Sequence, residues 1–133
     1  MYLKKQIKSF KYIIFVQNMF QKPYANIVAD HIRASCFIIA DGIKPSGKQR
    51  GYILRKLIRR SFSASLKLKI DISKPEYFED LTDSVIKIYD GVYDEVKENR
   101  QVIIEILLLE SQKYLKAIDI GQKEWQKIFK NIS

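Results

Sequence analysis

The sequence predicts an all-α protein, built as a single helical domain of five or six helices. Only three Pro and five Gly are spread over 133 residues, which leaves long uninterrupted stretches for helices. Apolar residues recur at spacings of three and four along these stretches, and no segment shows the alternation expected of a half-buried strand. Because 47% of the residues are hydrophobic, we expect residues 1–133 to form one domain around one core.

Two helices are predicted in the first third of the chain. Residues 3–20 place apolar side chains near one face and lysines elsewhere. Pro23 suits the first turn of a second helix, over about residues 24–41, and Gly42 is expected to end it. Since apolar residues occupy nearly every side of this second helix, we expect it to lie in the interior.

A loop and two further helices follow. Residues 44–48 contain Pro, Ser and Gly and are expected to form a loop, after which a third helix extends over about residues 51–64. Ser73 and Glu76 have the spacing of a capping box that opens a fourth helix. A buried stripe is expected on that helix at Phe78, Leu81, Val85, Ile88 and Val92.

A long fifth helix is predicted from about Asp94 to Ile118. Its inner side is expected to carry Val96, Ile103, Leu107, Tyr114 and Ile118. Gly121 is expected to break this helix. A short last helix would then be fixed in place by Trp125, Ile128 and Phe129.

Positive charge is concentrated in the first half of the chain. The net charge is +9, with 15 Lys or Arg and two acidic residues in residues 1–70, a local charge of +13. Residues 71–133 contain 9 basic and 13 acidic residues, a local charge of −4. A basic region of this kind is typical of proteins that bind nucleic acids or anionic surfaces.

The cysteine and histidine content excludes two kinds of site within one chain. Cys36 is the only cysteine and His31 the only histidine, whereas a zinc site needs about four ligands and a disulfide needs a pair of thiols. We expect Cys36 to be a small core residue. The single cysteine fits the reducing conditions of the cytoplasm. No apolar run approaches the roughly 20 residues of a membrane span, and no signal peptide is recognisable.

The third predicted helix carries the candidate binding surface. On a helical wheel of about 100° per residue, its aliphatic side chains, Ile53 among them, gather on one side. The opposite side presents four cations around Tyr52, namely Arg55, Lys56, Arg59 and Arg60.

No acidic residue lies four positions away to relieve the repulsion among these cations, so a polyanion such as RNA would be favoured. A run of charges on a helix is more often only a solvated face, but the regional charge and the adjacent loop favour binding here. For Tyr52, packing and stacking on a base are equally compatible with the sequence.

Three segments closely resemble the alanyl-tRNA synthetase family. They are ADHIRA at residues 29–34, IADGIKPS at residues 39–46 and RGYILRKLIRR at residues 50–60, in unbroken order. In that family a class II catalytic domain joins the amino acid to tRNA, and a helical part that follows it grips the acceptor stem of tRNA-Ala.

The catalytic and editing motifs of the family are not found in this chain. The resemblance therefore implies a tRNA-binding module of an alanine–tRNA ligase without a catalytic residue or metal site. It also implies no cofactor in this chain, since ATP and Mg²⁺ would belong to the missing catalytic domain.

The resemblance also implies which residues contact tRNA. The family reads a G·U pair in the acceptor stem through an Asn after Pro-Ser and through an Asp in a later segment. Here Gly47 stands in place of the Asn and the sequence ends before the Asp segment, so phosphate contacts are expected to be better retained than base contacts. The implied tRNA-binding residues are Lys44, Ser46, Gly47, Lys48, Gln49, Arg50, Tyr52, Arg55, Lys56, Arg59 and Arg60.

Four residues are expected to support this surface. His31 is expected to be buried and hydrogen-bonded, joining the second and third helices, with RNA contact beside Arg33 as the alternative. Asp30 and Asp41 are expected to orient Arg33 and Arg55 from behind.

Two other functions remain open. Gly47 favours a free-standing, sequence-tolerant RNA-binding protein derived from a split synthetase. A scaffold is the third possibility, in which the lysines of residues 3–20 and the acidic helix of residues 94–118 dock a partner such as a separate catalytic subunit.

Overall fold

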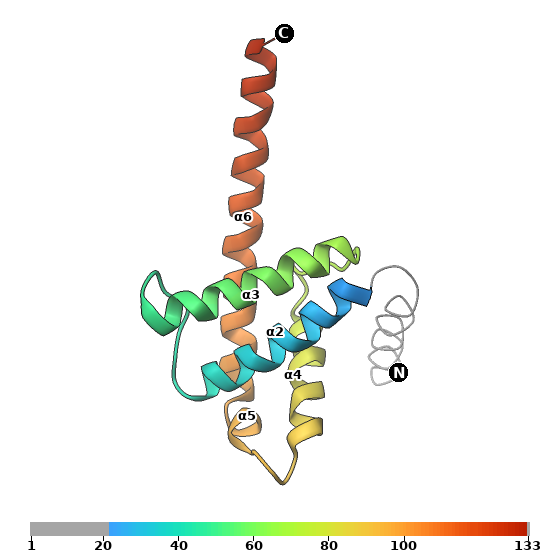
Figure 1. Cartoon of the computed structure of the whole chain (residues 1–133), viewed down its shortest axis with the longest axis vertical. Coiled ribbons are helices and arrows are strands. Elements are labelled where there is room, and N and C mark those ends of the chain that lie inside the picture. Colours follow the sequence, from blue (N-terminus) through green and yellow to red (C-terminus); the bar gives the residue numbers. More distant parts are fainter. Residues whose placement is uncertain (1–21, 133) are drawn as a thin grey trace.

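The computed structural model describes residues 22–132, and all of its regular structure over that range is helical (Figure 1). The helices are α2 (Lys22–Ala40), α3 (Gln49–Lys67), α4 (Pro75–Tyr89), α5 (Glu95–Glu98) and α6 (Arg100–Ile132). The predicted all-α class is therefore confirmed. The first predicted helix, over residues 3–20, lies outside the described residues.

The helices are arranged as two crossing pairs. Figure 1 shows α2 and α3 running in opposite directions across α4 and α6, and α2 and α3 contact each other extensively. The first half of α6 contacts α3 and α4, whereas its second half extends well beyond the other helices (Figure 1). None of the helices in residues 22–132 is long and apolar enough to cross a membrane.

The core lies where α2, α3, α4 and α6 meet. One stripe of α2 is buried, at Val28, Ile32, Cys36 and Ile39. The fully buried rings of Phe62 on α3 and Phe78 on α4 lie 5.7 Å apart, a separation typical of stabilising aromatic pairs. The predicted interior position of α2 is confirmed for this stripe only, since Ala29, Asp30 and Arg33 on another side of the helix are exposed. The core position of Cys36 is confirmed.

A left-handed glycine ends α2 where the sequence predicts. The N–H of Gly42 donates to the carbonyl oxygen of Ile39 at 2.8 Å. The N–H of Ile43 donates to the carbonyl oxygen of Ile38 at 3.4 Å, which completes a Schellman motif. Gly42 has a φ of 91°, a conformation that side-chain-bearing residues rarely adopt, and it turns the chain into the next loop.

The predicted capping box at the start of α4 is wrong. The N–H and Oγ of Ser73 both donate to Oδ1 of Asp71, at 2.9 and 2.6 Å, so the Ser73 side chain faces the preceding loop. Lys74 occupies the N-cap position without a side-chain cap, and Pro75 begins the helix. Pro suits that position because the first N–H groups of a helix have no intrahelical partner.

The buried stripe predicted on α4 is shorter than expected. Phe78, Leu81 and Val85 are buried, whereas Ile88 and Val92 are 68% and 70% exposed. The helix ends at Tyr89, so Val92 lies in the following loop and Ile88 lies in the last turn, at the edge of the fold.

The predicted break at Gly121 is also wrong, because α6 passes through this position without interruption and extends over 33 residues, from Arg100 to Ile132. A single glycine costs a helix roughly 1 kcal/mol, and the strong helix formers on both sides outweigh this. Trp125 and Phe129 are 61% and 58% exposed, and Ile128 is 49% exposed. These side chains therefore lie on the extended part of α6 and do not fix a separate helix to the core.

Candidate nucleic-acid interface

The loop between α2 and α3 is held against the first turn of α3 at Gly51. The N–H of Ser46 donates to the carbonyl oxygen of Gly51 at 3.1 Å. A Cβ on Gly51 would lie 2.6 Å from the carbonyl oxygen of Lys44 and closer still to Oγ of Ser46. Only glycine permits this approach. Gly51 is not among the predicted site residues, although a glycine in the first turn of a predicted helix is a signal in the sequence for such a contact.

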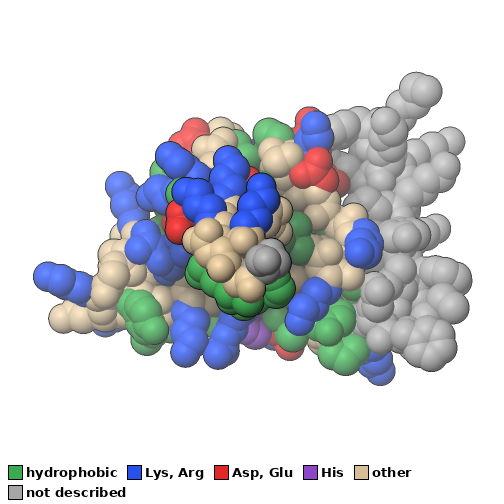
Figure 2. Space-filling view, turned by 90° about the horizontal axis from the view of Figure 1, so that it is seen from above, with side chains coloured by type: hydrophobic (Ala, Val, Ile, Leu, Met, Phe, Trp, Pro, Cys, Tyr) green, Lys and Arg blue, Asp and Glu red, His purple; other side chains and the backbone are tan. Residues whose placement is uncertain are grey.

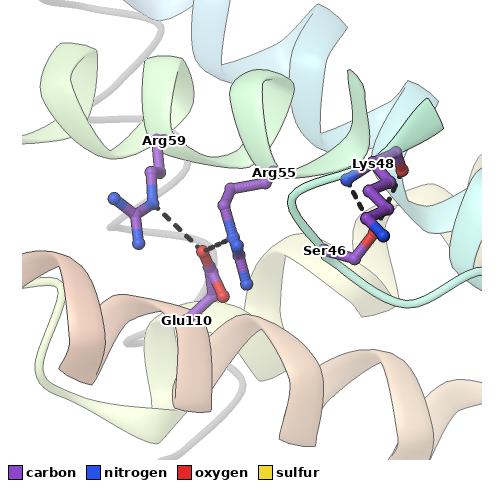
Figure 3. Close-up of polar contacts among 5 residues, drawn as sticks. All are labelled: Ser46, Lys48, Arg55, Arg59 and Glu110. Carbon is purple, nitrogen blue, oxygen red and sulfur yellow. Dashed lines mark hydrogen bonds and ion pairs between the residues drawn. The ribbon is translucent and has the colours of Figure 1, made fainter. Parts of the chain in front are cut away.

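Local hydrogen bonds fix the shape of this loop. Oγ of Ser46 donates to the carbonyl oxygen of Lys48 at 3.1 Å, and the N–H of Lys48 donates back to Oγ at 3.4 Å (Figure 3). Gln49, the first residue of α3, has a φ of 51°, which is uncommon for a residue with a side chain. The loop is therefore held in one particular conformation beside the start of α3.

No residue of α3 itself compensates the partial positive charge at its N-terminal end. Its N-cap residue, Lys48, makes no side-chain cap, and no acidic residue lies in the first turn. The first N–H groups of α3 and the positive end of its helix dipole therefore add to the charges of Lys48 and Arg50.

Cations are exposed along the loop and α3. The exposed ones are Lys44, Lys48, Arg50, Lys56, Arg60 and Lys67. Figure 2 shows basic side chains predominating at the end of the molecule where α3 begins, with few acidic ones among them. Tyr52 is 53% exposed, so it is not a core residue, and its stacking on a base stays a prediction. Ile53 was expected on the core side, but it is 56% exposed.

Arg55 and Arg59 are paired with a buried carboxylate. The Nε–H groups of both arginines donate to the same oxygen, Oε1 of Glu110 on α6, at 2.9 and 3.0 Å (Figure 3). The Glu110 side chain is only 2% exposed, and those of Arg55 and Arg59 are 29% and 36% exposed. The expectation of four cations without an acidic neighbour is therefore wrong for these two.

The carboxylate that pairs with Arg55 also differs from the expected one. Asp41 was expected to orient Arg55, but it is exposed and has no ion pair with Arg55, whose position is set by Glu110 instead. Asp30 does pair with Arg33, at 3.3 Å, as expected. Glu110 lies 55 and 51 positions away from the two arginines, so no helical wheel of α3 reveals it.

The ion pairs with Glu110 change how Arg55 and Arg59, here called the arginine pair, can bind a ligand. Each guanidinium carries several N–H donors, and the two hydrogen bonds to Glu110 use only the Nε–H groups. The two cations and one carboxylate leave one positive charge in excess. The Arg59 guanidinium also lies over the ring of Tyr114, 6.0 Å from its centroid. The pair thus joins α3 to α6 and is held in a fixed orientation.

His31 lies in a groove between α2 and α3. The groove has a volume of about 390 Å³ and is lined by Tyr24, Ile27, His31, Arg60, Ser63, Ala64 and Lys67. His31 is half-buried, and among residues 22–132 its side chain has no hydrogen-bond partner. It lies between the second and third helices as predicted, but the expected hydrogen bond is not found there.

Comparison with known proteins gives a consistent result. The family model described as tRNA synthetases class II (A) matches residues 2–133. The chain is 43% identical to the alanine–tRNA ligase of Borreliella afzelii over 109 residues, which are 80% of the chain and 18% of that protein. It is 37% identical to the alanine–tRNA ligase of Borrelia hermsii over 122 residues, 90% of the chain and 20% of that protein.

A relative from another bacterial genus gives a similar match. The alanine–tRNA ligase of Neisseria meningitidis serogroup B is 39% identical over 101 residues, 76% of the chain and 11% of that protein. The resemblance seen in the three segments is therefore confirmed. The chain spans a fifth or less of the length of these relatives.

Proposed function

The chain belongs to the class II (A) tRNA synthetase family, and on that premise we propose that it is the part of an alanine–tRNA ligase that grips the acceptor stem of tRNA-Ala. Aminoacylation, with its need for ATP, Mg²⁺ and alanine, would be carried out by a catalytic domain outside this chain. The cytoplasm is the proposed compartment.

The observation that carries this proposal is the row of exposed cations on a rigid support. Lys48 and Arg50 lie where the loop meets α3, and Lys56 lies on the outward side of the helix. The loop is held in place by its contact with Gly51. Cations in fixed positions bind the phosphates of an RNA stem and release condensed counterions, without contact to the bases.

The arginine pair adds a second element to the proposed surface. Because Glu110 binds only the Nε–H groups, the terminal amino groups of Arg55 and Arg59 lie outside these two hydrogen bonds. Their side chains are also about one third exposed. We propose that these groups contact a phosphate and that Glu110 is a positioning residue, which holds both guanidinium groups before RNA binds.

The salt dependence of binding tests the proposal. The full chain would be titrated with a fluorescent minihelix that carries the tRNA-Ala acceptor stem, and the affinity would be measured by anisotropy at several salt concentrations. Arg50→Gln and Lys56→Gln should each weaken binding and lower the slope of log affinity against log salt by about one unit. Neither substitution removes a described ion pair, so both variants should remain folded.

A matched control is available on α4. Lys87 is also exposed but lies outside the proposed surface, so Lys87→Gln should leave both affinity and slope unchanged. If the wild-type chain does not bind the minihelix, or if all three variants bind it alike, the proposed function is wrong.

Sequence-tolerant RNA binding is a second candidate, favoured by Gly47. This residue has no side chain to contact a base, and no atom lies within 4 Å of a Cβ built at this position. The same titration with the G·U pair of the minihelix replaced by G·C separates the two candidates. Preference for the G·U stem supports a tRNA-Ala module, and equal affinity supports the sequence-tolerant binder.

A further inference from the structure

We infer that the groove between α2 and α3 is a second RNA contact site, which takes one phosphate and its ribose from the RNA backbone. The inference rests on the proposed function and names an additional contact for the same partner. It concerns the flank of α3 that faces α2, whereas the pair held by Glu110 faces α6.

The groove is formed by two facing rows of side chains. Residues 24, 27 and 31 of α2 are three and four positions apart, as are residues 60, 63 and 67 of α3, so each row lies along one face of its helix. The Lys67 ammonium lies over the ring of Tyr24, 4.8 Å from its centroid. Because α2 and α3 run in opposite directions (Figure 1), this contact at one end places His31 and Arg60 at the other.

The chemistry of the lining suits an anion. Arg60 and Lys67 supply two cations, and none of the described residues that line the groove is acidic. Unlike Arg55 and Arg59, Arg60 has no carboxylate partner within residues 22–132. Two cations without an acidic neighbour make the groove favourable for an anion, and the arginine binds phosphate with forked donors.

The uncharged lining residues suit the sugar next to the phosphate. Ser63 offers a hydroxyl, and the imidazole of His31 offers a ring nitrogen that no described residue uses. Ile27 and Ala64 supply an apolar floor. The groove volume of about 390 Å³ lies at the small end of the range for ligand pockets, roughly 300–1,000 Å³, which suits one nucleotide unit and not a duplex.

The first test is the affinity for the acceptor-stem minihelix. The double variant Arg60→Gln/Lys67→Gln should bind about tenfold more weakly at low salt and lose about two units of salt slope. Lys69→Gln is the matched control, because Lys69 is exposed just beyond α3 but does not line the groove. Far-ultraviolet circular dichroism would check that all variants remain folded.

The second test uses the fact that the chain has a single histidine. The Cε1–H proton of the His31 imidazole therefore gives a single signal in the proton spectrum, and this signal reports on the groove directly. The minihelix should shift it in the wild-type chain and not in the double variant, whereas inorganic phosphate at the same concentration should leave it in place. An equal shift with phosphate alone would identify a free-anion site and overturn the inference of an RNA contact.

The outcomes separate this inference from the proposed function. If Arg50→Gln weakens binding while the double variant behaves like Lys69→Gln and the His31 signal does not move, the groove is not an RNA site but the proposed function stands. If the wild-type chain does not bind the minihelix at all, both are wrong.

Discussion

Replacing Glu110 by Gln tests the most consequential contact in the fold. The substitution keeps the shape of the side chain and one oxygen acceptor but removes the charge that holds Arg55 and Arg59. Since Glu110 is 2% exposed, water cannot easily take over its role. We expect the two guanidinium groups to lose their fixed orientation and α3 to be held less tightly to α6.

The size of the effect follows from the geometry. Hydrogen bonds to a charged group contribute roughly 1.5–3 kcal/mol each, and Glu110 accepts two, at 2.9 and 3.0 Å. The full sum is not expected, because the arginine side chains are 29% and 36% exposed and water compensates part of the loss. Gln also retains an acceptor. We therefore expect the free energy of unfolding to fall by about 2 kcal/mol.

Urea denaturation followed by circular dichroism measures this change. With a slope of roughly 1–3 kcal/mol per molar urea, the midpoint should fall by about 1 M. Glu105→Gln is the matched control, because Glu105 lies on the same helix, is exposed and, within residues 22–132, accepts a hydrogen bond only from Gln101, at 3.1 Å. Its effect should stay within about 0.5 kcal/mol. Equal midpoints for the two variants would refute the structural role assigned to Glu110.

Four further substitutions and probes test other parts of the structure. Gly51→Ala should lower the free energy of unfolding by about 1–3 kcal/mol in urea denaturation, because its Cβ has no room beside the loop, whereas Gly47→Ala should change it little. Gly47→Asn should increase the preference for a G·U over a G·C minihelix, and an unchanged ratio would show that this position does not read the base pair. Gly121→Ala should slow hydrogen exchange in the second half of α6, since its Cβ meets nothing and alanine favours the helix by about 1 kcal/mol; faster exchange would contradict a continuous helix. Burial raises the pKa of Cys36 to about 12, so its thiol should react with a disulfide reagent only after unfolding in urea, and rapid reaction in the native protein would contradict its core position.

Several features could be predicted because neighbouring residues determine them. The buried stripe of α2 follows from apolar spacing alone, and the end of α2 follows from the conformational freedom of Gly42. The three segments over residues 29–60 were sufficient to indicate the family. These signals are local, so folding in three dimensions does not alter them.

Other features could not be predicted, because they depend on contacts between residues far apart in the sequence or on competition between two local interactions. The bridge between Glu110 and the arginines of α3 forms only when α6 packs against α3. At the start of α4, the Ser73 side chain could bind either the first N–H groups of the helix or the Asp71 carboxylate. It binds Asp71. At Gly121 the cost of a single glycine is smaller than the helix preference of its neighbours.

Amide hydrogen exchange with and without the acceptor-stem minihelix tests most directly whether α3 and its loop form the RNA-binding surface. Bound RNA should slow exchange in the loop of residues 41–48 and along α3, and should leave the loop of residues 90–94 between α4 and α5 unchanged. Protection confined to residues 90–94, or absent throughout the chain under conditions where anisotropy shows binding, would contradict the account.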